Sequence, residues 1–126
     1  MESLTGLAQT VTNLFHVKCT FCCDEVVLVE NQTAATHLFR IAQEATNNAI
    51  KHGQASKVLI TLKNDAEGVS LAIRDNGIGI PRELPATRGM GMQIMNHRAE
   101  AIGAVLVVRR AGKSGTAVTC MLPARA

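Results

Sequence analysis

The chain has 126 residues, of which 47% are hydrophobic, and its formal net charge is only +3. This size and apolar content suit one globular domain with its own core, and we expect residues 1–126 to form a single domain. The weak charge, the absence of Trp and Tyr and the presence of only three Phe argue against nucleic acid as a partner. One anionic ligand in a local basic pocket remains compatible with this composition.

The sequence shows neither a membrane span nor a secretion signal. No apolar run approaches the roughly 20 residues needed to cross a bilayer. Met1 to Phe15 has neither a basic start nor a continuous apolar core. We therefore expect a cytoplasmic domain that does not insert into a membrane itself, although a full-length protein can be anchored elsewhere.

The first elements in chain order are a helix and a strand. Ser3 to Phe15 places its apolar residues on one face, which predicts a short helix that covers a sheet. Val17 to Cys23 alternates apolar and polar residues, the pattern of a half-buried strand. Asp24-Glu25 then predicts a turn, and Val26 to Val29 a short extended run.

Three of the four cysteines cluster in CTFCC, and the fourth is Cys120. A structural zinc site would need four ligands, and the usual two-by-two spacing is missing. Cys19 and Cys23 instead fall on the apolar side of the predicted strand, where cysteine acts as a small apolar residue. Core packing is the preferred interpretation, with metal binding or redox sensing by Cys19, Cys22 and Cys23 as the alternative.

The longest predicted element is a helix from Thr33 to His52. Asn31 or Thr33 is suited to cap its start, and Gly53 is suited to end it. Apolar residues recur at the three-and-four spacing of a buried face. They are Ala34, Leu38, Ile41, Ala45 and Ala49.

One edge of this helix combines a carboxylate, an amide and an ammonium group. At roughly 100° per residue, Glu44, Asn48 and Lys51 project within about 60° of one another. An ordinary helix with a polar rim explains this edge equally well. The meaning of the edge therefore depends on motifs elsewhere in the chain.

A β-hairpin and a long loop follow the central helix. Lys57 to Lys63 and Val69 to Arg74 read as two strands around a loop rich in turn-forming residues. Asp75 to Gly91 has no sustained period and contains several glycines and prolines, so we expect a functional loop there.

The last elements are a helix and a second hairpin. Met92 to Ile102 has helical spacing and is followed by Gly103 as a C-terminal cap. Ala104 to Arg110 and Thr116 to Leu122 read as a strand pair. Few helices separated by hairpins favour an α/β two-layer sandwich, in which helices cover one face of a mixed, mostly antiparallel sheet. A doubly wound parallel sheet is disfavoured.

Two glycine motifs border the predicted loop. Asp75 follows a strand directly, so its carboxylate is expected to face a cleft, and Gly77 and Gly79 permit close approach of a ligand. Gly89 and Gly91 precede a helix, whose N-terminal N–H groups favour a phosphate. Each motif alone also fits a simple glycine turn.

Taken together, the motifs resemble the Bergerat-fold (GHKL) ATPase family, which includes histidine kinases, gyrase, mismatch-repair ATPases and the large heat-shock chaperone. RIAQEATNNAIKHG resembles the N box of that family, RDNGIGIP its first glycine box, RGMGM its second and SGTAVTCMLP its closing strand pair. The resemblance spans Leu38 to Pro123, with all four motifs in the family's order. Within the family, QEATNNAIKHG and MNHRAEAIGA are most similar to the histidine-kinase branch of nitrate-sensing and fluidity-sensing kinases.

This resemblance implies a site for ATP and Mg²⁺. In it, Glu44 is the general base or polarising carboxylate and Asn48 the Mg²⁺ ligand. Asp75 accepts the adenine amino group, helped by Thr116. The remaining implied contacts are made by the glycines of both boxes and by a methionine where relatives often have Leu. These residues are Gly77, Gly79, Gly89, Gly91 and Met92.

The residue types fit this chemistry independently. Mg²⁺ prefers oxygen ligands, which the amide of Asn48 supplies. Lys51 is placed to meet a phosphate, and His52 to donate to phosphate or ribose. A carboxylate at Asp75 reads an exocyclic amino group, so adenine is preferred over guanine. Phosphoryl transfer then depends on positioning and charge neutralisation, with the loop closing over the triphosphate.

None of the four histidines lies in an acidic-flanked phosphoacceptor motif. His52 belongs to the N box, and His16, His37 and His97 are interpreted as structural. We therefore expect the chain to bind ATP without phosphorylating itself. The resemblance implies that the phosphate goes to a histidine of a dimeric helical phosphoacceptor domain, and from there to a response regulator.

Two other functions remain open at this stage. A serine kinase of the anti-sigma type uses the same fold and would phosphorylate a protein directly. A non-catalytic, ATP-responsive interaction module would bind nucleotide only. A gyrase-like or mismatch-repair ATPase is less favoured, because the transducer domain that follows in those proteins is absent here.

Overall fold

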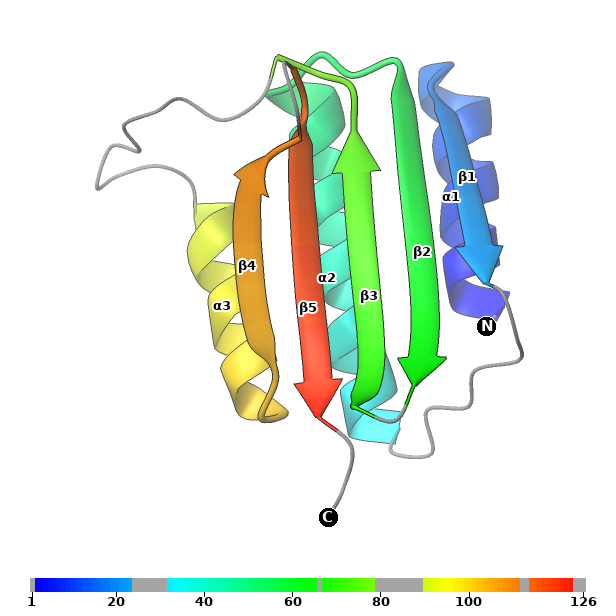
Figure 1. The fold of residues 1–126 in the computed structure, drawn as a ribbon. Helices are drawn as coiled ribbons and strands as arrows, with labels where there is room; N and C mark the ends of the chain where they lie inside the picture. Colours follow the sequence, from blue (N-terminus) through cyan, green and yellow to red (C-terminus); the bar gives the residue numbers. More distant parts are fainter. Residues whose placement is uncertain (1, 24–31, 66, 79–89, 112–113, 124–126) are drawn as a thin grey trace.

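The computed structural model describes residues 2–23, 32–65, 67–78, 90–111 and 114–123. In these residues three helices cover one face of a five-stranded sheet, as Figure 1 shows. The helices are α1 (Glu2–Phe15), α2 (Gln32–Lys51) and α3 (Met90–Ala101), and the strands are β1 (Lys18–Cys23), β2 (Lys57–Asp65), β3 (Gly68–Asp75), β4 (Val105–Arg110) and β5 (Thr116–Pro123). The predicted two-layer α/β sandwich is confirmed. No helix in the described ranges is long and apolar enough to span a bilayer.

The strand order across the sheet is β1-β2-β3-β5-β4. β1 and β2 run parallel, so α2 forms the crossover between them, and every other neighbouring pair is antiparallel. Both predicted hairpins are therefore present. Because β3 and β5 are antiparallel and pair Arg74 with Ala117, the end of β3 lies beside the start of β5. This register places Asp75 next to Thr116.

The core lies between α2 and the covered face of the sheet. The predicted apolar face of α2 is buried as expected, and Ala42 and Thr46 widen it. On the sheet side the fully buried side chains include Ile60, Leu62 and Leu71. Burial of this kind contributes about 25 cal/mol for each Å² of apolar surface removed from water. This burial holds α2 against the sheet and so determines the direction in which the polar edge of α2 faces.

Thr46 is the exception in this core, because its side chain is polar and 0% exposed. Its hydroxyl has no hydrogen-bond partner among the described residues. An unpaired buried hydroxyl costs about 1–3 kcal/mol. We predict that Thr46→Val, which keeps the branched shape, raises the free energy of unfolding by roughly 1 kcal/mol. Urea denaturation measures this change, and a variant less stable than the parent would contradict it.

Two helix boundaries differ from the predictions. Thr33 lies inside α2 rather than at its cap, and Asn31 lies outside the described residues. After α2 the left-handed residue is Gln54, with φ of 52°, and not Gly53. Gly53 is required for another reason, since a Cβ there would lie 2.8 Å from the carbonyl oxygen of Ala49.

The boundaries of α3 also bear on the site. The helix begins at Met90, so Gly91 lies in its first turn rather than in the preceding loop. Gly103 has the predicted capping role, with φ of 73°, and the N–H of Ala104 donates to the carbonyl of Ala99 at 2.8 Å.

The cysteines follow the predicted strand pattern where they are described. Cys19 is buried in β1 and Cys22 is exposed, which confirms the alternation. Burial raises the pKa of the Cys19 thiol and raises that of Cys120 to about 11. No group of three or more potential metal ligands occurs among the described residues. The extended run predicted for Val26 to Val29 lies outside them.

Candidate functional site

The carboxylate of Asp75 occupies the end of β3 and is half-buried. Its Oδ1 accepts hydrogen bonds from the N–H of Gly77 at 2.8 Å and from the N–H of Thr116 at 3.3 Å. Burial raises the pKa of Asp75, and these two N–H donors partly offset the increase. A carboxylate has roughly four acceptor positions, so this side chain retains capacity for a further donor.

Close approach of backbone segments gives this part of the site its shape. A Cβ on Gly77 would collide with the carbonyl oxygen of Gly53, and one on Gly115 with the carbonyl oxygen of Asp75. Gly115 also has φ of 95°, a conformation that disfavours any residue with a side chain. Gly77 was predicted as a site residue, whereas Gly53 and Gly115 were missed.

Asn76 ties the segment after β3 to the connection between α2 and β2. Its Oδ1 accepts the N–H groups of Ser56 and Lys57, both at 2.9 Å, and its Nδ2 donates to Oγ of Ser56 at 2.9 Å. Nearby, the N–H of Ile78 donates to the carbonyl of Gly53 at 2.8 Å. These bonds hold the end of β3 against the end of α2.

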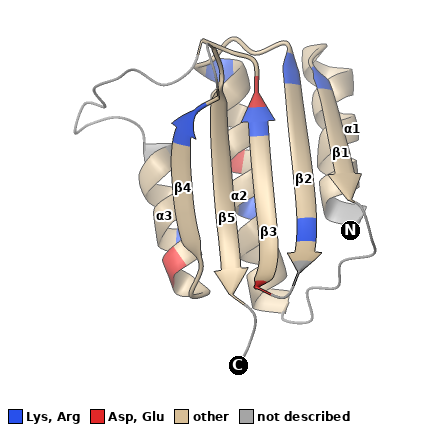
Figure 2. Ribbon diagram, viewed as in Figure 1, with Lys and Arg blue, Asp and Glu red and all other residues tan. Residues whose placement is uncertain are grey.

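The polar edge of α2 therefore leads toward Asp75. Glu44 and Asn48 are half-buried on this edge, while Lys51 and His52 are exposed at the helix end. The carbonyl of Asn48 accepts the N–H groups of His52 and Gly53 at 2.9 and 3.0 Å. Figure 1 shows the end of α2, the end of β3 and the start of β5 meeting at one end of the sheet. In Figure 2, acidic and basic positions mark α2, and an acidic position marks the end of β3.

The second glycine motif is described only in part. Gly91 and Met92 lie in the first turn of α3, which packs beside α2. Backbone N–H groups in a first turn lack helical partners and favour an anion. Met92 is half-buried and packs against the core. Gly79 and Gly89 lie outside the described residues.

The structure thus brings together Asp75, Gly77, Thr116 and the end of α2. Sequence reasoning missed three contributors, which are Gly53, Asn76 and Gly115. The sequence provides little indication of these residues, because each lies in or beside a motif already described and none has a side chain that by itself indicates a ligand. Asn76 and Gly115 could have been found as direct neighbours of Asp75 and Thr116.

Comparison of the sequence with known proteins identifies a family and several relatives. Residues 33–126 match the family described as Histidine kinase-, DNA gyrase B-, and HSP90-like ATPase. The nitrate/nitrite sensor protein NarX of Escherichia coli K12 is 42% identical over 84 residues, covering 67% of this chain and 14% of NarX. NarQ of the same organism is 32% identical over 119 residues, covering 94% and 21%. The sensor protein VraS of Staphylococcus saprophyticus is 37% identical over 87 residues, covering 69% and 25%.

The chain therefore spans a quarter or less of the length of these relatives. Among solved structures, the ATP binding domain of PrrB from Mycobacterium tuberculosis superposes with a TM-score of 0.80 at 21% identity, covering 99% of this chain and 93% of that one. Full-length ShkA in complex with AMPPNP superposes with a TM-score of 0.76 at 19% identity, covering 99% and 30%. At these identities the likeness shows a shared fold.

Proposed function

The chain belongs to the histidine kinase-, DNA gyrase B- and HSP90-like ATPase family, as the ATP-binding catalytic domain of a sensor histidine kinase, and from this premise we propose how its residues act. ATP binds with its adenine at Asp75, and its γ-phosphate passes to a histidine of a separate, dimeric helical phosphoacceptor domain. A response regulator then takes the phosphate, and these events occur in the cytoplasm. The observation that carries the proposal is the half-buried Asp75 carboxylate, held by two N–H donors and retaining acceptor capacity.

Adenine recognition follows from this carboxylate. Its free acceptor positions suit the exocyclic amino group of adenine, whereas guanine presents a carbonyl oxygen at the equivalent place. The N–H groups of Gly77 and Thr116 keep the carboxylate of Asp75 oriented toward the base. Gly79 is proposed to border the base as well.

The phosphates are proposed to run along the edge of α2 toward the start of α3. Lys51 and His52, both exposed, supply positive charge or hydrogen-bond donors, and Gly89, Gly91 and Met92 supply backbone N–H groups. The half-buried amide of Asn48 offers an oxygen ligand beside the Glu44 carboxylate, and oxygen ligands of this kind fit Mg²⁺. When bound, Mg²⁺ neutralises charge on the phosphate oxygens.

Nucleotide binding is tested by calorimetric titration with a non-hydrolysable ATP analogue, with and without Mg²⁺, and with the matching GTP analogue. We expect binding that prefers adenine and that Mg²⁺ strengthens. Equal affinity for the GTP analogue would contradict the role of Asp75. No binding to either analogue would contradict the proposed nucleotide site.

Glu44 is proposed to accept or polarise the proton of the attacking histidine. General acid–base catalysis contributes roughly 10²–10⁴-fold to a rate. We predict that Glu44→Gln lowers phosphotransfer to a separately supplied phosphoacceptor domain by at least about 100-fold, while the dissociation constant for the ATP analogue changes less than about threefold.

Glu100→Gln is the matched control, because Glu100 is exposed on α3 and has no assigned role. Phosphotransfer is measured with radiolabelled ATP, and acid treatment of the product identifies the acceptor. An acid-stable product would replace the histidine kinase assignment with a serine kinase of the anti-sigma type. A rate for Glu44→Gln close to that of Glu100→Gln would contradict the role of Glu44.

A further inference from the structure

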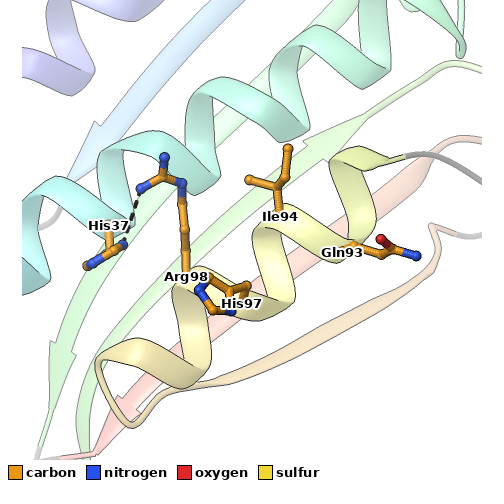
Figure 3. A pocket seen from close by; sticks show the side chains of 5 residues that line it. All are labelled: His37, Gln93, Ile94, His97 and Arg98. Carbon is orange, nitrogen blue, oxygen red and sulfur yellow. Dashed lines mark hydrogen bonds between the residues drawn. The ribbon is translucent and has the colours of Figure 1, made fainter.

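A second cavity lies between α2 and α3, apart from the proposed nucleotide site. Its volume is about 660 Å³, and it is lined by His37, Gln93, Ile94, His97 and Arg98 (Figure 3). His37 precedes Glu44 by seven residues and Asn48 by eleven, or about 10 and 16 Å along the axis of α2. The cavity is therefore formed by the opposite end of α2 from the one that approaches Asp75.

Two polar side chains, Arg98 and His37, meet in this cavity. Arg98 extends from α3 toward α2, and its Nη1 lies 3.3 Å from Nδ1 of His37 (Figure 3). A guanidinium only donates, so Nδ1 of His37 accepts and the proton of the neutral ring is on Nε2. The remaining N–H groups of Arg98 and the Nε2–H of His37 are then donors for a ligand.

Arg98 has no acidic counterpart in the described part of the chain. Its hydrogen-bond partner there is the neutral imidazole of His37. Glu44 lies about 10 Å further along the axis of α2 than His37 and is not among the residues that line the cavity. The positive charge of Arg98 is therefore available to an anion.

The lining also contains an apolar surface. Ile94 lies on the side of α3 that borders the cavity, and 40% of it is exposed. Sites for small molecules commonly enclose 300–1,000 Å³ and combine apolar walls with a few convergent polar groups. A cavity of this size that presents the guanidinium of Arg98 and the apolar side chain of Ile94 suits a ligand with both an anionic group and an apolar body.

From these features we propose that the cavity between α2 and α3 binds a small organic oxyanion. The carboxylate or phosphate group of the ligand bonds to Arg98 and His37, and its apolar body packs on Ile94. Guanidinium groups bind such oxyanions through two parallel hydrogen bonds. This site is separate from the ATP site proposed above, because none of the residues assigned to ATP lines the cavity.

Phenyl phosphate is the probe that tests the proposal, with phenol and inorganic phosphate as partial probes. Titrations followed by amide chemical shifts in ¹⁵N spectra report both the affinity and the place of binding. We expect phenyl phosphate to shift the amides of His37, Ile94 and Arg98 and to bind at least tenfold more tightly than either partial probe. Titrations are repeated with the non-hydrolysable ATP analogue at saturation, which keeps the probe out of the nucleotide site.

Three variants separate charge, apolar contact and folding. Arg98→Gln is expected to weaken phenyl phosphate binding at least tenfold, and Arg98→Lys is expected to weaken it less. Ile94→Ser is expected to make phenyl phosphate bind no more tightly than inorganic phosphate. Arg110→Gln is the control, because Arg110 is exposed at the end of β4. Shifts confined to the Asp75 region, or equal binding by Arg98→Gln and Arg110→Gln at unchanged melting temperature, would overturn the proposal.

Discussion

Asp75→Asn is expected to weaken binding of the ATP analogue by roughly 10- to 150-fold. A hydrogen bond to a charged group contributes about 1.5–3 kcal/mol, and each 1.4 kcal/mol corresponds to a factor of ten. The asparagine keeps an oxygen that accepts the N–H groups of Gly77 and Thr116, so the local backbone is preserved. What it loses is the anionic acceptor for the adenine amino group. Isothermal titration measures the change.

Glu100→Gln again provides the control, since it makes the same chemical change on an exposed part of α3. We expect its affinity to remain within twofold of the parent. If Asp75→Asn also bound the ATP analogue with parental affinity, the adenine would have to lie elsewhere. The proposed orientation of the nucleotide would then be wrong.

Although Asp75→Asn is expected to weaken ATP binding, it is not expected to lower the stability of the fold. Because burial raises the pKa of Asp75, the native state holds this proton more tightly than the unfolded chain does. Ionisation of Asp75 therefore destabilises the fold as pH rises through and above its unfolded value of 3.8. We expect Asp75→Asn to be at least as stable as the parent at pH 7, with the difference shrinking near pH 3. Denaturation at both pH values checks this expectation.

Gly115→Ala is expected to have the second large effect, on both folding and binding. The residue has φ of 95°, and a Cβ would collide with the carbonyl oxygen of Asp75. Left-handed backbone alone costs a residue with a side chain about 1–2 kcal/mol, and the collision adds to this. We predict a loss of at least about 2 kcal/mol, or a fall of roughly 8 °C in Tm. ATP analogue binding falls too, because Asp75 must move.

Gly6→Ala is the matched control for this change. Gly6 lies in α1, and nothing is within 4 Å of the position of its Cβ. Alanine inside a helix is more stable than glycine by about 0.5–1 kcal/mol, so this variant should melt at a higher temperature. Thermal unfolding followed by circular dichroism measures both variants. A Gly115→Ala protein that melts within 2 °C of the parent would show that the contact with Asp75 is relaxed at little cost.

Local pattern was sufficient to predict the elements of the fold. The apolar spacing from Ala34 to Ala49 matches the buried face of α2, and alternation in β1 matches its burial. Turn-forming residues located both hairpins, since strand pairs joined by short loops are determined by nearby residues. The boundaries were less well predicted: α3 begins at Met90, two residues before the predicted start, because helix ends depend on weak local signals.

The site was predictable only as a set of motifs. Glu44, Asn48 and Lys51 share an edge because of helical geometry alone, and Asp75 follows a strand by its position in the sequence. The order of the four motifs then indicated the ATPase family, which the sequence comparison confirmed. The individual roles of these residues toward ATP stay predictions, tested by the experiments above.

The sequence by itself determined the helices, the strands, the buried faces and the family of this protein. Those properties depend on periodicity and on motifs of a few neighbouring residues. Only the tertiary structure decided that Gly53 meets Gly77, that Asn76 holds Ser56, and that Gly115 lies against Asp75. These pairs are 20 to 40 residues apart in the chain, and strand register and helix packing bring them together. A contact that depends on how the whole sheet is assembled leaves no periodic trace in the sequence.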